Sequence, residues 1–375
     1  MSLDLLWTIL PLSFAICVIL TVIAIPEIIR IAFEKQLFDV PDYRKVHKGQ
    51  VPRLGGVTFL PGIMISVLIS FGLMSAFAYP ADIQMEIMFG AAGAMFLYMT
   101  GITDDLIGLS YRVKFPIQII SAFMLCASGL WIDNFYGILG IHQIPAIIGV
   151  PFTVCVIVLV INAINLIDGI DGLASGLCIF AMIAFSVMFI MEGQDRFAVI
   201  CVAALGVLLP FYLYNVYGTS AKRTKIFMGD AGSLTMGYMI AALTVKIALF
   251  EDDVLKDSQP YYFVYAFSVL LVPALDVMRL FFHRIIHKRS PFYPDRCHIH
   301  HKFMAVGMSI GQARHTIIGM SLAFFLLNIL ICRYININIL LAGDVLVWTV
   351  IHILLSHRIK ILKARNAPSA SMYQE

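Results

Sequence analysis

The stretch VCVIVLVINAINLIDGIDGLASG, residues 154–176, changes from a wholly apolar run into a run of amides, acids and glycines. The repeated residues are Asn162, Asn165, Asp168 and Asp171, one every three positions. On a helix this spacing gives a slowly turning polar stripe. The apolar run before it needs no such stripe for solubility. The stretch therefore predicts a buried helix that ends in a functional polar segment.

Helix capping is the ordinary explanation for part of this pattern. Asn and Asp are common at helix ends, where a glycine often follows. Capping accounts for one or two of the four side chains, but not for all four in register. Gly169 and Gly172 break the helix and let the backbone come close to a ligand. The functional interpretation is therefore favoured.

The whole chain has the composition of a membrane protein. Of its 375 residues, 60% are hydrophobic and 13% are charged, and a soluble domain needs about twice that charged fraction. Apolar runs of ~20 residues predict an all-α, polytopic transmembrane helix bundle of about 11 spans. The expected spans are 6–29, 55–78, 85–103, 115–132, 146–165, 173–191, 197–217, 232–250, 261–282, 315–332 and 337–356. Residues 1–362 are expected to form a single domain, followed by a polar, disordered tail over 363–375.

The placement of Lys and Arg predicts the orientation. The first positive charge, Arg30, follows the first span, which places the N-terminus outside and the C-terminus in the cytosol. Among the 26 Lys and Arg residues, those that fall clearly outside the expected cytosolic loops are Arg196, Lys246, Lys256 and Arg333. The cytosolic loops also carry nearly every other unusual polar residue, which indicates one functional face.

An acidic pair, Asp104-Asp105, follows the third expected span in TGITDDLIGLSYRVK. An Asp at the centre of a bilayer costs ~3 kcal/mol, so the pair is expected at the membrane edge. Two carboxylates there can bind a metal or act as a base. The alternative is a pair of loop carboxylates that mark the membrane edge, and spacing alone does not choose.

A second acidic position, Asp230, stands between glycines in KRTKIFMGDAGSLTMG, residues 222–237. It comes directly before an expected span, so it suits an exposed carboxylate at a helix start. A plain N-cap is the alternative.

The loop HRIIHKRSPFYPDRCHIHHKF, residues 283–303, is rich in Arg, Lys and His. Such a loop suits phosphate or pyrophosphate binding. Cys297 and the neighbouring histidines lack the second ligand pair that a structural zinc site normally has. Ordinary positive-inside charge or contact with anionic lipid headgroups is the alternative.

Together these segments favour phosphate chemistry. Carboxylates and amides are the oxygen ligands that Mg²⁺ or Mn²⁺ prefers, and the cations suit an anionic substrate. A proton or cation pathway needs acids inside the spans, not cations grouped around acids at one face. A transporter or flippase for a lipid-linked or nucleotide sugar shares the spans and cations, but it does not require a set of Asp and Asn side chains for a metal. A CDP-alcohol phosphotransferase is expected to carry DG-x-x-A-R, and DGIDGLASG has no arginine in place.

The order DD, NxxNxxDGxDGL, FMGDxGS and HIHH on this hydropathy resembles the polyprenyl-phosphate N-acetylhexosamine-1-phosphate transferases, over about Asp39 to His301. The bacterial undecaprenyl-phosphate GlcNAc-1-phosphate transferases look nearest. The resemblance implies a Mg²⁺-dependent (or Mn²⁺-dependent) enzyme of the inner (plasma) membrane, with its active site facing the cytosol. Its implied substrates are a UDP-N-acetylhexosamine and undecaprenyl phosphate. A different UDP-amino sugar and a homodimer stay open, and no nucleic-acid partner is expected.

The resemblance also implies roles for residues. Asp104, Asp105 and Asp168 match catalytic acids, with Asp104 as the proposed base, and Asn165 and Asp230 match the Mg²⁺ positions. The substrate-binding residues expected are Lys48, Asn162, Gly169, Ile170, Asp171, Asn215, Phe227, Arg296, His298, His300 and His301. Lys48, Gly169, Ile170, Asp171, Asn215 and Phe227 are expected on the nucleotide side, and the last four at the sugar and pyrophosphate. Asn162 is expected among the substrate-binding residues without a more specific role.

Two chemical routes are open for such an enzyme. The lipid phosphate can attack directly, or a phosphosugar can form first on an Asp. Direct attack is the favoured hypothesis, because a phosphate oxyanion is already a competent nucleophile with a second pKa near neutrality.

Overall fold

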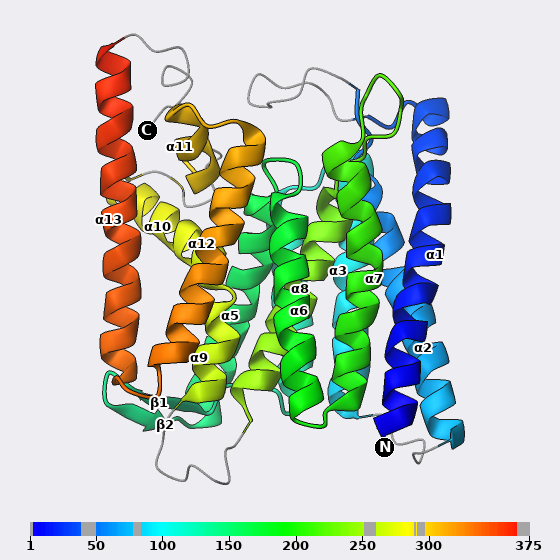
Figure 1. The fold of residues 1–375 in the computed structure, drawn as a ribbon. Helices are drawn as coiled ribbons and strands as arrows, with labels where there is room; N and C mark the ends of the chain where they lie inside the picture. The colour runs from blue at the N-terminus through cyan, green and yellow to red at the C-terminus, as the bar shows by residue number, and fades with distance from the viewer. Residues whose placement is uncertain are drawn as a thin grey trace.

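The protein is described here by a computed structural model, which covers residues 3–38, 50–77, 84–250, 260–288, 290 and 297–365. Its elements form one bundle of upright helices with a small hairpin at one end (Figure 1). The helices are α1 (Leu3–Lys35), η1 (Gly55–Thr58), α2 (Phe59–Phe77), α3 (Met85–Ile107), α4 (Tyr111–Ala127), α5 (Ala146–Ile167), α6 (Leu173–Met191), α7 (Asp195–Tyr217), α8 (Gly229–Ala248), α9 (Tyr261–Ser268), α10 (Leu271–Ile286), α11 (Ile299–Ala305), α12 (Ile310–Ile331) and α13 (Ile337–Ala364).

The bundle has the helices of a multi-pass membrane protein. In the described part of the chain, nine helices are long and apolar enough to cross a membrane, or up to ten if the bent pair α9–α10 counts as one span. Helix α4, with 17 residues, occupies the place of the remaining expected span. The predicted polytopic helical bundle is confirmed, whereas the number of eleven spans stays a prediction.

The expected span 261–282 is not one straight helix. Helices α9 and α10 meet at an angle of 70°. Pro273 lies in the first turn of α10, where its missing N–H is tolerated, but it cannot continue the hydrogen-bond ladder of α9. The break turns α10 toward the end of the bundle that carries the polar segments predicted above.

Two smaller corrections concern the fold class and the tail. Strands β1 (Asn134–Ile138) and β2 (Ile141–Gln143) form an antiparallel hairpin, which an all-α prediction omits. Helix α13 continues to Ala364, so the helical part ends two residues beyond the expected boundary at residue 362. The remainder of the expected disordered tail, from residue 366, lies outside the described residues.

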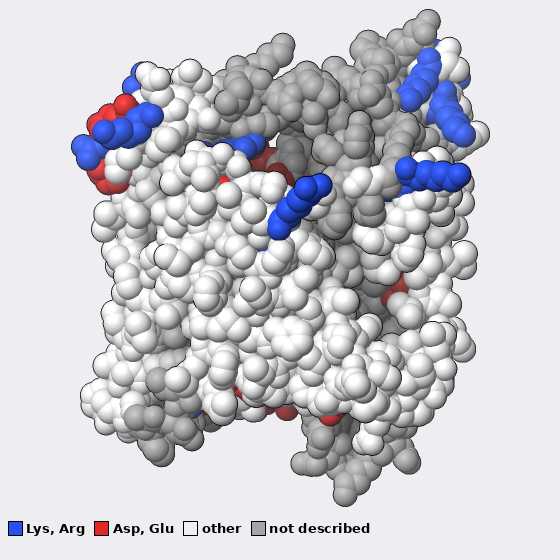
Figure 2. Space-filling model, turned by 180° about the vertical axis from the view of Figure 1, so that it is seen from behind, with Lys and Arg blue, Asp and Glu red and all other residues white. Residues whose placement is uncertain are grey.

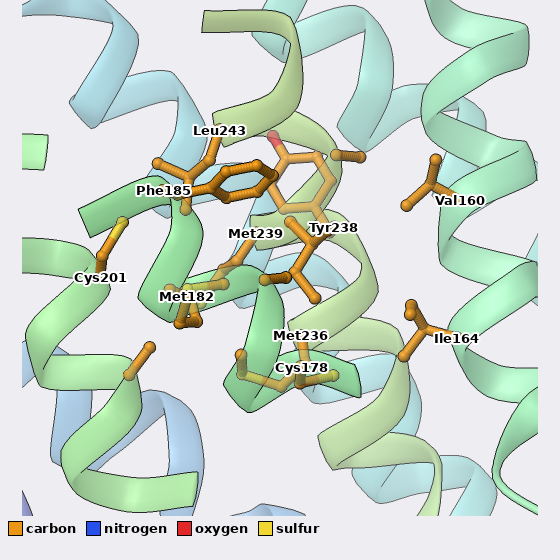
Figure 3. Packing of buried hydrophobic residues seen from close by; sticks show 14 of the residues in the cluster. Val160, Ile164, Cys178, Met182, Phe185, Cys201, Met236, Tyr238, Met239 and Leu243 are labelled. Carbon is orange, nitrogen blue, oxygen red and sulfur yellow. The ribbon is translucent and has the colours of Figure 1, made fainter. Parts of the chain in front are cut away.

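Helix α8 lies in the middle of the bundle. Of its apolar stretch, 89% is buried, compared with 22% for α13 at the edge. It packs against α3, α5 and α6. Figure 3 shows Met236, Tyr238 and Met239 of α8 among buried side chains of α5 and α6, including Ile164 and Phe185. The packing of α8 against these helices therefore also fixes the position of residues on its first turn.

Charged residues gather at the ends of the bundle. Figure 2 shows Lys and Arg mainly at the upper end, a few acids at the lower end and a belt between them that is almost uncharged. The described N-terminal helix begins at the lower end, whereas the end of α13 and helix α11 lie at the upper end (Figure 1). This separation has the form that the sequence predicts for a membrane protein with one polar, basic face.

Close helix contact at the start of α8 depends on glycines in neighbouring elements. A Cβ atom on Gly101 of α3 would lie 2.4 Å from Cα of Ala231. A Cβ atom on Gly56 of η1 would lie 2.1 Å from the backbone nitrogen of Gly232. Real Cβ atoms do not approach backbone this closely, so both neighbours of α8 need glycine here.

We expect Gly101→Ala to destabilise the protein by about 1–3 kcal/mol, because the added methyl group must push α3 away from α8. Thermal unfolding in detergent measures the change. Gly72→Ala is the matched control, because a Cβ on Gly72 meets no atom within 4 Å. Equal unfolding temperatures for both variants would show that the α3–α8 contact is not tight.

Candidate active site

The N-terminus of α8 is fastened to the end of α3. Oδ1 of Asp105 accepts a hydrogen bond from the backbone N–H of Asp230 at 2.8 Å, and Oδ2 accepts one from Ala231 at 3.0 Å. These N–H groups belong to the first turn of a helix, where no carbonyl of the same helix can accept from them. The carboxylate also faces the positive end of the helix dipole. Asp105 therefore fixes where the helix starts.

Gly229 makes the sharp turn that precedes this helix. Its φ of +70° belongs to the left-handed region that favours glycine. A Cβ there would lie 2.0 Å from the carbonyl oxygen of Arg53 and 2.6 Å from Oδ2 of Asp105. The glycine in the GD pair is thus required both by the turn and by the packing of its neighbours.

Asp104 and Asp230 face the same cation. Nζ of Lys114, on α4, lies 2.8 Å from Oδ2 of Asp230 and 3.1 Å from Oδ2 of Asp104. Asp104 also accepts a hydrogen bond from the backbone N–H of Leu109. The two acids, far apart in the sequence, therefore share one position that favours positive charge.

Asn165, in the last turn of α5, completes this group. Its Nδ2 donates to Oδ1 of Asp230 at 3.1 Å and to Oγ of Ser233 at 2.8 Å. A half-turn of the amide presents its oxygen to the same place. Two carboxylates and one amide oxygen are a donor set that suits Mg²⁺, and the ammonium between the carboxylates shows that the geometry accepts a cation. Among the described residues, no group of three or more His, Cys, Asp or Glu side chains has the arrangement of a metal site.

Asp168 lies just after α5, between this group and the following turn. Its burial raises the pKa of the carboxyl well above the usual value, and the negative charges of Asp230 and Asp171 raise the pKa further. The positive charge of Arg53 acts in the opposite direction. A raised pKa favours the protonated form, so Asp168 differs chemically from Asp230, which forms an ion pair with Lys114.

The turn after Asp168 is tied to the segment before α8. Oδ1 of Asn215 accepts from the backbone N–H of Gly172 at 2.6 Å, and its Nδ2 donates to the carbonyl of Ile226 at 2.8 Å. Asn215 is buried, so its side chain positions two segments and does not face solvent. Ile170 is also buried, with 3% exposed, so it packs in the core and does not face solvent.

Asp171 and Phe227 lie at the accessible edge of these segments. Asp171 forms an ion pair with Lys225 at 2.5 Å, and its carbonyl accepts from Arg314 of α12 at 3.1 Å. The backbone of Phe227 is held by Pro52, whose carbonyl accepts its N–H at 2.8 Å, while its half-buried side chain stays partly accessible. This edge combines an aromatic ring with two cations.

The histidine segment is held by an acid inside α10. Nδ1 of His298 lies 2.9 Å from Oδ2 of Asp276, and the backbone N–H of Ile299 donates to the same carboxylate at 3.2 Å. Arg279 donates to Oδ1 of Asp276 at 3.1 Å. Asp276 therefore orients the start of α11.

His300 reaches the turn after α5. A Cβ on Gly169 would lie 2.4 Å from Nε2 of His300, so glycine makes room for the ring. Burial lowers the pKa of His300 well below its usual value, and the nearby His301 and His298 lower the pKa further. His300 therefore packs against Gly169 as a neutral ring. This contact joins the HIHH segment to the DGIDG segment.

The remaining predicted residues are Asn162, Lys48, Arg296 and His301. Asn162 points its Nδ2 to Oε1 of Gln118 on α4 at 2.7 Å and to the carbonyl of Val158, one turn away from Asn165. Lys48 and Arg296 lie outside the described residues. His301 is partly exposed and follows directly on His300.

Contributors that the sequence did not predict include Lys114, Ser233, Lys225, Arg314 and Asp276. Lys114 closes the TGITDDLIGLSYRVK segment, so a cation ten residues after an acidic pair was the available signal. Asp276 stood alone inside an expected span, and a carboxylate within a membrane segment needs a partner. No local pattern pointed to Ser233.

The fold and the site define a multi-pass membrane protein that groups acids, an amide and cations at one end of its bundle. A model of glycosyl transferase family 4 matches residues 87–248. The chain is 32% identical over 305 residues to a protein of Bacillus subtilis (strain 168) named "probable undecaprenyl-phosphate N-acetylglucosaminyl 1-phosphate transferase", with 79% of this chain and 78% of that relative covered.

Relatives in two other bacteria carry the corresponding name, undecaprenyl-phosphate alpha-N-acetylglucosaminyl 1-phosphate transferase. The protein of Escherichia coli O157:H7 is 29% identical over 289 residues, which cover 76% of this chain and 73% of the relative. The protein of Yersinia pestis is 28% identical over 286 residues, which cover 76% and 74%. The chain therefore belongs to glycosyl transferase family 4, in the group of the undecaprenyl-phosphate N-acetylglucosaminyl 1-phosphate transferases.

Replacing the acid that holds α8 should cost stability. We expect Asp105→Ala to destabilise the protein by about 1–2 kcal/mol, because two N–H groups of the first turn lose their acceptor. Thermal unfolding in detergent tests this, with Asp133→Ala as control because Asp133 is exposed. A loss no larger than that of the control would contradict the capping role.

Proposed function

We propose that the protein transfers GlcNAc-1-phosphate from UDP-GlcNAc to undecaprenyl phosphate, giving undecaprenyl-diphospho-GlcNAc and UMP. The names of its relatives support this reaction. The observation in the structure that carries it is the group formed by Asp104, Lys114, Asp230 and Asn165 at the end of a membrane bundle. One substrate is soluble and the other is anchored by its lipid tail, so a site at a membrane edge can receive both.

We also propose the orientation of the protein. It has eleven spans, with α4 as the eleventh, an outer N-terminus and a cytosolic C-terminus, in the inner membrane. The concentration of Lys and Arg at one end of the bundle supports a cytosolic active site. A cytosolic site has direct access to the nucleotide sugar.

The proposed cofactor is Mg²⁺, which Mn²⁺ can replace. Asp230 and Asn165 would hold it, with Asp104 alongside, since these supply hard oxygen donors within one group. When bound, the ion would stabilise negative charge on the phosphoryl oxygens. Lys114, which lies between the two carboxylates, would then turn toward a phosphate.

Cationic side chains at the site would reduce the electrostatic repulsion between the two substrates. Both substrates are anions, and two like charges at 4 Å repel by ~4 kcal/mol at an effective dielectric constant of about 20. Lys114 and Lys225 each border the site from a different element. We assign Lys114 to the phosphate to be attacked and Lys225, beside Phe227, to the nucleotide.

The acids then have separate roles. Asp104 is the proposed base for the lipid phosphate, a modest contribution because that phosphate is already largely ionised. Asp168, whose raised pKa favours its protonated form, would donate a hydrogen bond to an oxygen of the donor. Asp171 and Gly169 line the uridine side, and His300 and His301 approach the sugar and pyrophosphate.

Release of UMP by purified protein tests the reaction. With UDP-GlcNAc, undecaprenyl phosphate and Mg²⁺, we expect UMP that depends on the lipid and stops with EDTA. Asp230→Ala should lower the rate by roughly a hundredfold or more, because it removes a carboxylate that would hold Mg²⁺. The charge of this ion stabilises the transition state. The control Asp133→Ala should keep the rate of the unchanged protein.

Exchange of the donor distinguishes the remaining alternatives. UMP from UDP-GalNAc at a higher rate than from UDP-GlcNAc would assign a different amino sugar to the same chemistry. A folded protein that binds UDP-GlcNAc but releases no UMP from any UDP-N-acetylhexosamine would refute the enzyme and favour a transporter.

Direct attack predicts that no sugar becomes attached to the protein. Incubation with UDP-[¹⁴C]GlcNAc without lipid, followed by denaturation, should leave the protein unlabelled. Acid-labile label that disappears in one of the variants Asp104→Asn, Asp105→Asn or Asp168→Asn would instead establish a covalent intermediate.

A further inference from the structure

A cavity of about 720 Å³ lies between α10, α11 and α13, outside the group of acids described above. Helix α13 stands at the edge of the bundle, next to α10 and α11 (Figure 1). Helix α10 packs against α5, which carries Asn165, whereas the cavity lies between α10 and α13. The cavity is therefore separate from the proposed reaction centre.

The side chains around the cavity are strongly basic. Arg279, Lys302 and Lys360 line it together with three histidines, His283, His352 and His357. No Asp or Glu is among the described residues of its lining. The carboxylate of Asp276 on α10, outside the lining, is already held by Arg279 and His298. A cavity with this charge favours an anion.

The lining also changes from apolar to basic along α13. Val345, Trp348 and Ile353 lie toward the middle of the helix, and Lys360 lies near its end. The 15 residue-to-residue steps from Val345 to Lys360 span about 22 Å along a helix, which exceeds the roughly 15 Å of one leaflet's hydrocarbon layer. A molecule that fills this space needs an apolar part inside the membrane and an anionic part at its edge.

Two buried polar side chains in the wall have no hydrogen-bond partner in the described structure. Both ring nitrogens of His352 and Nε1 of Trp348 are buried and unpaired. His352 is only 6% exposed. Buried polar groups are normally hydrogen-bonded, so these two side chains indicate a ligand with oxygen acceptors at this depth, such as the ester or glycerol oxygens of a lipid.

We propose that this cavity binds an anionic phospholipid of the surrounding membrane. Its phosphate lies at Lys302 and Lys360, its glycerol and ester oxygens at His352 and Trp348, and its chains beside Val345 and Leu275.

The occupant would stabilise the histidine segment from behind. Arg279 lines the cavity and donates to the carbonyl of Cys297 at 2.5 Å as well as to Asp276, which holds His298. A lipid phosphate near this wall therefore supports the position of the segment that carries His300 and His301. The lipid acts through contacts and takes no part in the transfer.

Native mass spectrometry of the whole chain in detergent tests the proposal. The probes are dioleoyl phosphatidylglycerol and, as the zwitterionic comparison, dioleoyl phosphatidylcholine. In the double variant Lys302→Met with Lys360→Met, we expect phosphatidylglycerol to bind about 25-fold more weakly, since each basic side chain near an anionic lipid contributes roughly fivefold. The matched control, Arg358→Met with Lys363→Met, removes two charges from α13 outside the cavity lining and should keep the binding.

A second measurement covers the case in which the double variant does not fold. Phosphatidylglycerol with brominated chains should quench the fluorescence of the unchanged protein, and Trp348→Phe should remove the larger part of that quenching. Quenching that is unaffected by Trp348→Phe would place the lipid elsewhere.

Three outcomes would overturn the proposal: equal binding in both double variants, displacement of phosphatidylglycerol by inorganic phosphate alone, or one-for-one displacement by undecaprenyl phosphate. The second would indicate a simple anion site, and the third a site for the acceptor lipid. None of these measurements uses the transferase reaction, so a failure of the proposed function leaves this test intact.

Discussion

The two hydrogen bonds from the first turn of α8 to Asp105 are the contact on which the site depends. They fix the end of α3 against the start of the most deeply buried helix, with bonds of 2.8 and 3.0 Å. Asp230 is the second residue of that helix, so its carboxylate can move little. Because Asp104 is the neighbour of Asp105, the same contact brings it to Lys114. The close approach needs glycine at Gly101 and Gly229, which explains why the sequence around both acids is rich in small residues.

Much of the fold could be predicted from the sequence, for a physical reason. Inside a bilayer every backbone polar group must be hydrogen-bonded within the segment, so a long apolar run becomes a helix. Helices α5 to α8 accordingly start and end within a few residues of the expected spans. The 70° break at α9–α10 was missed because composition alone does not tell a proline that a helix tolerates from one that redirects it. The hairpin β1–β2 was missed because it lies in a short connection between two spans.

The site was predictable in its members but less so in their roles. Motif order predicted that Asp104, Asn165 and Asp230 belong to one site, and the structure places the three side chains in one group because each lies at a helix end on the same side of the bundle. Pairings over long sequence distances, such as Asp276 with His298 or Asp230 with Lys114, have no local signal. Sequence also could not separate a residue that touches a ligand from one that holds the backbone. Asn215 is of the second kind, because both ends of its buried amide are engaged by the protein.

We propose that Asp104, Asn165 and Asp230 form one cation site beside the donor. A structure of the protein with UDP-GlcNAc and Mn²⁺, with the ion located by its anomalous scattering, tests this most directly. We expect one strong peak within coordinating distance of a carboxylate oxygen of Asp230, with Lys114 displaced from between the acids. A bound nucleotide sugar with no Mn²⁺ at Asp230, or with Mn²⁺ at the histidine segment instead, would contradict it.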